Sequence, residues 1–491
     1  MNFNSKNEWN LRLFPYFCNM FIGRKEEKRR LINAYESEDS EFVAVYGRRR
    51  VGKTYLIRET LKNKFTFYHT GRYKIPTKRQ IESFYLAMKE QGLKERRKPV
   101  SWMETFSLLK RLIESSTHKK KVIFLDELPW MDAAGSDFVS SLEFFWNSWA
   151  SARKDVMLII CGSASSWILK KIFRNKGGLH NRVTCKIPLK PFSLYEVELL
   201  VKERKLGYSR NNILEGYMAM GGVPIYWCKL EKSKSLAENI NDMFFLENGE
   251  FHNEYRELYD SLFLNAEKYK AIIEALATKR KGLTRSEIIK KAKLENNGRF
   301  SSMLEDLIEC GFIRKYCDLG KRVKDAKYQL IDFFTLFYFH FIREAVNVDQ
   351  NYWSMMQLQQ RYKVWCGIAF EKVCMVHSRQ IKKAMGISGI IANVFSWQNY
   401  TNDQYPKVQI DMIFERSDNL YSLFEMKYAP GGYRITRTEI DNILQRKNVF
   451  EALVKGKKGV QTVLVTSNGV SNSALASEIN CILEANELFV E

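Results

Sequence analysis

Apolar residues gather in three short, unbroken runs in the first third of the chain. They occupy residues 41–46 (Glu-Phe-Val-Ala-Val-Tyr), 121–125 (Lys-Val-Ile-Phe-Leu) and 156–161 (Val-Met-Leu-Ile-Ile-Cys). Central strands of a parallel sheet are covered on both faces, so they carry continuous rather than alternating apolar residues. Residues 55–61 follow the first run with helical apolar spacing. The pattern predicts an α/β fold built on a parallel sheet.

The pattern changes after about residue 264, where shorter helical segments begin. Residues 269–277 have apolar positions at helical spacing, and Gly282 ends that segment. Thr284 and Glu287 form a capping box for a second helix, and a third helix follows residues 296–298. Residues 311–316 and 326–330 then predict two strands joined by a charged loop. Three short helices and a β-hairpin predict a winged helix-turn-helix.

The predicted winged helix is rich in basic residues that suit contacts with phosphates. They are Lys279, Arg280, Lys281, Lys290, Lys291 and Lys293, and the third helix would present Arg299, Ser301 and Ser302 to a groove. Winged helices also serve as lids or as protein contacts, so the fold alone leaves both roles open.

A hairpin is expected near the C-terminus, in residues 409–428. Its first strand ends at the turn Ser417-Asp418-Asn419, and the second strand returns from Leu420. This geometry places Asp411 opposite Glu425, with Cβ atoms about 5 Å apart. Lys427 lies on the same face, two residues further on.

Length and charge limit the class of protein. The chain has 491 residues, more than one core usually holds, so several domains are expected. Lysine and arginine outnumber acidic residues by 78 to 56, and the net charge of +22 suggests a polyanionic partner. Nucleic acid comes first and an anionic membrane second, while a merely solvated basic surface stays an alternative.

Cysteine usage and hydropathy point to the cytoplasm. The nine cysteines include no C-x-x-C pair, so neither a zinc site nor a disulfide framework is indicated. The most hydrophobic stretch, residues 333–342, is far shorter than the ~20 residues that span a bilayer. We therefore expect a buried helix there and no membrane partner.

Residues 47–54 carry the first candidate chemistry. They match G-x-x-x-x-G-K-[ST], a phosphate-binding loop between a predicted strand and a predicted helix. The expected nucleotide-binding residues are Gly47, Arg48, Arg49, Arg50, Val51, Gly52, Lys53 and Thr54. The glycines make room for backbone N–H groups to hold phosphate oxygens, and Lys53 would reach the β- and γ-phosphates. The Thr54 hydroxyl would ligate Mg²⁺.

Four further residues complete the expected ATP site. Asp126 and Glu127 follow the second apolar run, where Asp126 would hold Mg²⁺ and Glu127 would polarise the attacking water. Ser163 follows the third run, where a γ-phosphate sensor would lie, although a serine-rich helix cap has the same pattern. Arg182 is a candidate arginine finger, with an exposed surface arginine as the alternative.

The C-terminal carboxylates suggest a second, different site. Asp411 and Glu425 would repel each other without a cation between them, and a divalent metal there would activate water for attack on a phosphodiester. Lys427 would position or deprotonate that water. A solvent-facing strand pair without catalysis is the structural alternative.

These motifs resemble those of known families. The segments Phe21-Ile22-Gly23-Arg24-Lys25-Glu26, the phosphate loop, residues 125–130, Gly162-Ser163 and Gly221-Gly222-Val223-Pro224 resemble the AAA+ P-loop ATPases, more narrowly the STAND-related archaeal-type group. The resemblance implies that Pro224, in a helical lid, approaches the bound nucleotide. Asp411 with Glu425-Met426-Lys427 resembles the PD-(D/E)xK nucleases, which implies Glu371 as an additional metal ligand and Gln445 as a polar helper. Gln409-Ile410-Asp411 replaces the Pro-Asp of that motif's name.

The sequence thus predicts four regions: an N-terminal extension (1–20), an ATPase domain with helical lid (21–264), a winged helix (265–350) and a restriction-endonuclease-like α/β domain (351–491). The expected function is ATP hydrolysis with Mg²⁺, coupled to action on nucleic acid, with DNA as the expected partner and nuclease activity left open. The rival is a STAND-like signalling ATPase whose C-terminal domain only binds other molecules. The sequence also leaves open whether the chain forms a homo-oligomer in which Arg182 acts across subunits.

Overall fold

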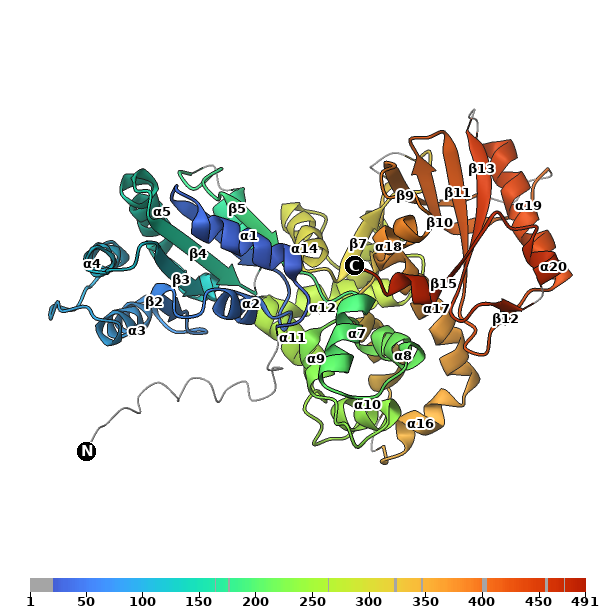
Figure 1. The fold of residues 1–491 in the computed structure, drawn as a ribbon, viewed down its shortest axis with the longest axis horizontal. Helices are drawn as coiled ribbons and strands as arrows, with labels where there is room; N and C mark the ends of the chain where they lie inside the picture. The colour runs from blue at the N-terminus through green and yellow to red at the C-terminus, as the bar shows by residue number, and fades with distance from the viewer. Residues whose placement is uncertain are drawn as a thin grey trace.

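A computed structural model describes residues 21–163, 165–174, 177–263, 265–321, 325–345, 348–399, 404–454, 458–471 and 473–491. The expected extension, residues 1–20, lies outside the described residues. The N-terminal sheet and the C-terminal sheet occupy opposite ends of the molecule, and helices fill the space between them (Figure 1). No helix in the described ranges is both long and apolar enough to cross a membrane.

The N-terminal sheet has five parallel strands in the order β2-β3-β4-β1-β5. Their bounds are β1 Glu41–Tyr46, β2 Phe65–Thr70, β3 Lys121–Asp126, β4 Val156–Gly162 and β5 Cys185–Pro188. The three apolar runs are the three central strands, β1, β3 and β4, as the sequence predicted.

Helices cover both faces of this sheet because alternate residues of each strand point to opposite sides. Val43 and Val45 of β1 pack with α1 (Lys25–Glu36) and α2 (Lys53–Thr60). Phe42 and Ala44 pack with α3 (Thr77–Glu90), α4 (Trp102–Glu114) and α5 (Phe138–Ser148). The loop between β1 and α2 therefore lies at the carboxyl edge of a fully covered sheet, where ligands bind in such folds.

After β4, the chain forms α6 (Ser165–Ile168) and a π-helical turn, η4 (Leu169–Phe173). Five helices follow β5, in the segment that the sequence predicted as a lid, and this name is kept for them: α7 (Leu194–Glu203), α8 (Arg210–Met220), α9 (Pro224–Cys228), α10 (Leu236–Phe244) and α11 (Glu254–Leu262). Serine capping boxes begin three of them, at Ser193, Ser209 and Ser235. These caps satisfy backbone N–H groups that a helix start otherwise leaves free.

The middle region, residues 265–345, contains the three helices and the hairpin that the sequence predicted. They are α12 (Ala266–Ala277), α13 (Arg285–Ala292), α14 (Gly298–Glu309), β7 (Ile313–Tyr316) and β8 (Lys327–Leu330). A short strand, β6 (Leu283–Thr284), completes an antiparallel sheet in the order β6-β8-β7. The Thr284–Glu287 capping box is present. Helix α15 (Phe333–Phe337) and a buried π-helical turn, η6 (Tyr338–Ile342), follow.

The C-terminal sheet is mixed, in the order β15-β13-β11-β10-β9. Its strands are β9 Ala392–Gln398, β10 Gln409–Arg416, β11 Leu420–Lys427, β13 Gly459–Thr466 and β15 Cys481–Glu484. Its helices are α16 (Tyr352–Gln357), α17 (Gln360–Val376), α18 (Ser378–Ala384), α19 (Arg437–Leu453) and α20 (Ser473–Ala476), and η7 (Ala485–Leu488) is a final 3-10 turn. A small parallel pair, β12 (Tyr433–Arg434) and β14 (Val470–Ser471), lies beside them.

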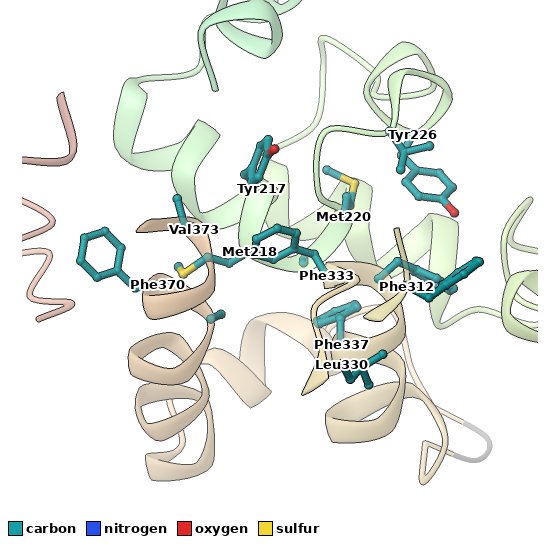
Figure 2. Packing of buried hydrophobic residues seen from close by; sticks show 14 of the residues in the cluster. Tyr217, Met218, Met220, Tyr226, Phe312, Leu330, Phe333, Phe337, Phe370 and Val373 are labelled. Atoms are coloured by element: carbon teal, nitrogen blue, oxygen red, sulfur yellow. The ribbon is translucent and has the colours of Figure 1, made fainter. Parts of the chain in front are cut away.

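One hydrophobic core joins the lid, the middle region and the C-terminal region. Figure 2 shows side chains of α8 between those of α15 and α17, with Met218 near Phe370 and Tyr217 above Phe333. The Tyr217 and Phe333 rings are 5.2 Å apart, edge to face. The two clusters of the N-terminal sheet are separate from this core. The apolar side chains of the lid therefore pack with the middle and C-terminal regions, although the lid also faces the loop between β1 and α2 of the N-terminal sheet.

Candidate functional sites

The phosphate loop connects β1 to α2, and its two glycines have distinct structural reasons. A Cβ at Gly47 would lie 2.2 Å from the carbonyl oxygen of Leu189, so that position admits no side chain. Gly52 has φ of +89° and is the N-cap of α2, a conformation that favours glycine. The loop therefore keeps its backbone close to β5 and directs the N-terminus of α2 toward the site.

Lys53, Thr54 and Asp126 come together in this loop. Lys53 is buried and donates hydrogen bonds to the carbonyl oxygens of Gly47 (3.0 Å) and Arg48 (2.9 Å). Thr54 Oγ1 donates to Asp126 Oδ2 over 2.9 Å. A hydroxyl beside a carboxylate, next to a phosphate loop, is a donor set that suits Mg²⁺ bound together with nucleotide phosphates.

Glu127 lies directly after β3 in a left-handed conformation, with φ of 46°. Its Oε2 accepts hydrogen bonds from the backbone N–H (3.1 Å) and the hydroxyl (2.9 Å) of Ser163. Burial raises the pKa of Glu127; the Lys53 ammonium opposes this rise and Asp126 adds to it. A carboxylate with a raised pKa is suited to accept a proton from water. Ser163 directly follows β4, as the sequence predicted, and the structure brings it into contact with Glu127.

The loop arginines differ from the expectation that all three serve the nucleotide. Arg48 forms a buried ion pair with Asp332, and Arg50 pairs with Glu254 of the lid. Arg49 is partly exposed. The side chains of Arg48 and Arg50 thus contact carboxylates of this chain. For the buried Arg48 guanidinium such a charged partner is needed, and the backbone of both residues is left for phosphate contacts.

A hollow that is open to solvent lies beside the loop, between the sheet and the lid. Its lining is mostly apolar and includes Phe21, Ile22, Tyr55, Phe192 and Pro224. The buried Arg24 also lines it, with its guanidinium carbon 4.5 Å from the centre of the Phe192 ring. An apolar hollow with a few fixed polar groups is suited to a planar base.

Sequence patterns assigned no individual role to Arg24, Tyr55 or Phe192 in this hollow. Only membership of residues 21–26 in a family motif pointed to the first of them. Pro224 was expected near nucleotide and is part of the lining, at the first turn of α9.

Arg182 is solvent-exposed in the turn before β5. Its side chain has no ion pair or hydrogen bond within the described ranges. The structure therefore does not bring it to the loop through any direct contact, and a role across subunits stays a prediction.

In the C-terminal sheet, β10 and β11 form the predicted hairpin with its turn at residues 417–419. Met412 is paired with Phe424, so the adjoining positions on the two antiparallel strands are Asp411 on β10 and Glu425 on β11. Asp411 accepts a hydrogen bond from the Gln409 amide. Glu425 pairs with Lys427 over 2.8 Å and also with Arg446 of α19.

Glu371 of α17 pairs with Arg280 of the middle region. Burial raises the pKa of Glu371, and the neighbouring Asp411 adds to that rise. Lys372 is buried beside them, and burial, with Arg314 adding, lowers its pKa well below the ordinary lysine value.

The expected metal site is not formed in this arrangement. No group of three or more His, Cys, Asp and Glu side chains that could hold a metal ion occurs in the part of the chain that the structure describes. The predicted ligands Glu371, Asp411 and Glu425 each already have a cationic or amide partner. Gln445, the expected polar helper, is exposed, and the next residue, Arg446, contacts Glu425 instead. The sequence did not identify Arg446 or Lys372, and it assigned Arg280 to phosphate contacts of the winged helix and not to Glu371.

The first site and its sheet define a class of protein. A parallel sheet in the order β2-β3-β4-β1-β5, with a G-x-x-x-x-G-K-T loop after β1 and Asp126 at the end of β3, is a P-loop nucleotide-binding fold. Residues 21–230 match the family described as an ATPase domain predominantly from Archaea. This part of the chain is an ATPase domain of the archaeal type.

Comparison with known proteins finds further similarity. The chain is 27% identical over 367 residues to an uncharacterized protein of Methanocaldococcus jannaschii, covering 72% of this chain and 76% of that protein. An uncharacterized ATP-binding protein of the same organism is 47% identical over 45 residues, which are 9% of this chain and 76% of that protein.

Two solved structures are similar at lower sequence identity. The Walker-type ATPase of Pyrococcus abyssi is 18% identical, with 64% of this chain and 95% of that chain covered and a TM-score of 0.48. The ORC2 protein of Aeropyrum pernix, in its ADPNP–ADP complexes, is 11% identical, with 74% and 97% covered and a TM-score of 0.43.

Proposed function

We propose that this protein binds and hydrolyses ATP as an AAA+ type enzyme related to the STAND group, and that its nucleotide state controls the action of the downstream regions on nucleic acid. The observation that carries the first part is the convergence of Lys53, Thr54, Asp126 and Glu127 at one edge of the parallel sheet. These are the residue types that phosphoryl transfer to water requires.

Each residue has a separate role in this proposal. The backbone of the loop holds the phosphates, and Lys53 exchanges its two carbonyl partners for phosphate oxygens. Thr54 and Asp126 would hold Mg²⁺, which neutralises charge on the β- and γ-phosphates when bound. Glu127 orients the attacking water once Ser163 no longer holds its Oε2.

ATP turnover by single variants tests the assignment. Lys53→Ala should lose ATP binding and turnover, whereas Glu127→Gln should keep binding and lose turnover by about 100-fold or more. An unchanged rate in both variants would remove these residues from the site. Lys62→Ala is a matched control, because this exposed lysine lies beyond the C-terminal end of α2.

For the downstream regions we propose a winged helix and a nuclease-like domain that engage DNA. The support is the net charge of +22 and the exposed cations Lys290, Lys293 and Arg299, which form no ion pairs within the described ranges. Other residues of the basic set have partners already: Lys279 pairs with Glu287, and Lys291 donates to Thr278.

The ion pairs of helix α14 indicate that this helix contacts the ATPase domain, and they argue against its insertion into a DNA groove. Its acidic residues Asp306 and Glu305 pair with Lys170 (2.9 Å) and Arg174 (2.7 Å) of the η4 segment. Such a helix would bring carboxylates toward phosphates if it entered a groove. We therefore place DNA contacts on its exposed N-terminal end, near Arg299, and on α13.

The rival function is a regulatory ATPase whose C-terminal domain binds protein without catalysis. The carboxylates Glu371 and Glu425 favour this rival, because in this arrangement each of them is paired with an arginine. Binding of labelled DNA at low salt separates the two, because contacts with phosphates weaken steeply as salt rises. Absence of binding at low salt would leave the regulatory ATPase as the better account.

A further inference from the structure

We propose that the middle region holds the C-terminal carboxylate site closed, with Arg280 in the place that a divalent cation would take, and that the site opens when β7, β8 and Arg280 move away from the C-terminal sheet. This inference rests on the proposed nuclease-like function and concerns its regulation. It explains why Glu371, which the sequence predicted as a metal ligand, is paired with a cation of the middle region.

The first observation is the position of Arg280. It follows α12, in a different region from the carboxylates, and its guanidinium pairs with Glu371 of α17. It is also electrostatically attracted to Asp411 and Glu425. Carboxylates that face each other need a cation among them. In this arrangement Arg280 supplies that positive charge.

The second observation is that the middle region fixes Arg280 in this position. The carbonyl oxygen of Arg280 accepts a hydrogen bond from Gln329 Nε2 over 2.7 Å, and Gln329 Oε1 accepts one from Arg314 Nε over 2.7 Å. Arg314 is electrostatically attracted to Asp411, and no carboxylate lies within ion-pair distance of it in the described ranges. Two guanidinium groups on one side of the interface thus face the carboxylates on the other.

The third observation is that the part of this interface beside the carboxylates is polar, whereas the hydrophobic core that joins the two regions lies elsewhere. Ser396 donates a hydrogen bond to Asp318 over 2.8 Å, and Leu319 N–H donates to the carbonyl of Ser396 over 2.8 Å. A small hollow that is open to solvent lies between β7, β8, β9 and β10, lined by residues that include Arg314, Tyr316 and Asp411. Polar contacts permit relative motion more readily than large apolar ones, so β7 and β8 can move away from β9 and β10 while the shared core stays packed.

The phosphate loop is connected to the same two strands. Arg48 pairs with Asp332 and lies 5.0 Å from the Phe312 ring. Phe312 directly precedes β7, and its carbonyl oxygen accepts hydrogen bonds from the N–H groups of Ile331 and Asp332, directly after β8. Arg314 and Gln329 belong to these strands. A movement of the loop on nucleotide binding would therefore move the strands that position Arg280.

Mn²⁺ binding to the full-length, nucleotide-free protein tests the inference. Free Mn²⁺ measured by electron paramagnetic resonance should show at least tenfold tighter binding of one ion in Arg280→Met than in the wild type. Adding Asp411→Asn to that variant should abolish the gain. Lys279→Met is the matched control, because this neighbouring cation pairs with Glu287 inside the middle region, and it should bind Mn²⁺ as the wild type does.

The outcomes separate the closed site from the nuclease proposal. Equal Mn²⁺ affinity of Arg280→Met and the wild type, with both proteins folded by thermal unfolding, would overturn the inference. A second variant, Arg280→Gln, repeats the test with a polar side chain in case methionine disturbs the interface. Tighter Mn²⁺ binding without DNA cleavage would support the closed site and reject the nuclease activity. Cleavage at the same rate by wild type and Arg280→Met would keep the nuclease and reject the closed site.

Discussion

Arg48 of the phosphate loop forms an ion pair with Asp332, which lies 284 positions further along the chain. Both side chains are buried: Arg48 is 3% exposed and Asp332 is 4% exposed. Asp332 also caps α15 by accepting hydrogen bonds from the N–H (2.9 Å) and hydroxyl (2.7 Å) of Thr335. Two nitrogens of Arg48, Nε and Nη2, are buried and have no hydrogen-bond partner among the residues that the structure describes. This pair joins the ATP site to the segment after β8.

Removing one partner of this pair should be costly. A buried charge left alone costs about 3–5 kcal/mol, whereas replacing both partners by apolar residues is often much less harmful. Arg48→Met and Asp332→Leu should each lower the denaturation midpoint strongly, and the double variant should recover part of the loss. Denaturant unfolding of all three proteins provides the measurement. Arg29→Met is the control, because the Arg29–Glu26 pair is solvent-exposed and should leave the midpoint unchanged.

The Ser163 hydroxyl should restrain Glu127 between turnovers. Ser163→Ala removes one of the two hydrogen bonds to Oε2 and keeps the backbone N–H bond. We expect a change in the ATP turnover number of about 10-fold or less with little change in ATP affinity, since the hydroxyl meets the glutamate and not the loop. Steady-state turnover and nucleotide titration together check this. A loss of ATP affinity would instead point to a direct contact between Ser163 and the γ-phosphate.

The C-terminal site should show whether its carboxylates act with metal. If DNA cleavage with Mn²⁺ occurs, Asp411→Asn and Lys427→Ala should each abolish it, because both side chains lie at the end of the hairpin that the proposed mechanism uses. Glu415→Gln is the matched control. This glutamate lies on the same strand but pairs with Lys458. Cleavage that persists in both site variants would have to come from other residues.

Gly222 should not accept a side chain. A Cβ there would lie 1.8 Å from the carbonyl oxygen of Phe192, a residue that lines the hollow next to the phosphate loop. The clash is with backbone, so Gly222→Ala must displace the lid and should cost about 1–3 kcal/mol and weaken ATP binding. Gly367→Ala is the control, because its Cβ would meet nothing within 4 Å and alanine favours the helix. Equal ATP affinity of the two variants would contradict this account of the lid.

Local features of the fold were predictable from sequence because they depend on neighbouring residues. The strands β1, β3 and β4, the Thr284 capping box and the β10–β11 hairpin follow from apolar periodicity and turn chemistry. The same holds for the proximity of Thr54 and Asp126, since the carboxyl ends of parallel strands share one edge.

Contacts between regions were not predictable in the same way. The ion pairs Arg48–Asp332, Arg50–Glu254 and Arg280–Glu371 join segments 284, 204 and 91 positions apart. No periodicity specifies how two folded units are placed relative to each other. The sequence therefore identified Glu371 as a carboxylate of interest but assigned it to a metal and not to an arginine.

His377 should make the stability of the protein depend on pH. It is buried at the end of α17, where Nε2 accepts a hydrogen bond from the N–H of Leu194 in the lid (3.0 Å) and Nδ1 donates to the carbonyl of Val373 (2.9 Å). A proton on Nε2 would face the N–H of Leu194, so only the neutral ring fits. Burial lowers the pKa of His377 to about 4.

The sign of the effect follows from this lowered pKa. The unfolded chain binds the proton at the ordinary pKa of 6.5, so it takes up more protons than the folded protein between that value and about 4. Stability should therefore fall as pH falls through this range, by about 2 kcal/mol from His377 between pH 7 and pH 5. His69, whose pKa burial also lowers to about 4, adds an effect of the same sign.

His377→Gln separates the two histidines. Glutamine can also accept from Leu194 and donate to Val373, but it does not titrate. The variant should lose less stability than the wild type between pH 7 and pH 5, even if it is less stable at pH 7, while His69 contributes equally to both proteins. Denaturation midpoints at the two pH values supply the comparison. Identical pH dependence in variant and wild type would mean that His377 does not stay neutral between the lid and α17, and that this contact does not hold the two regions together as described.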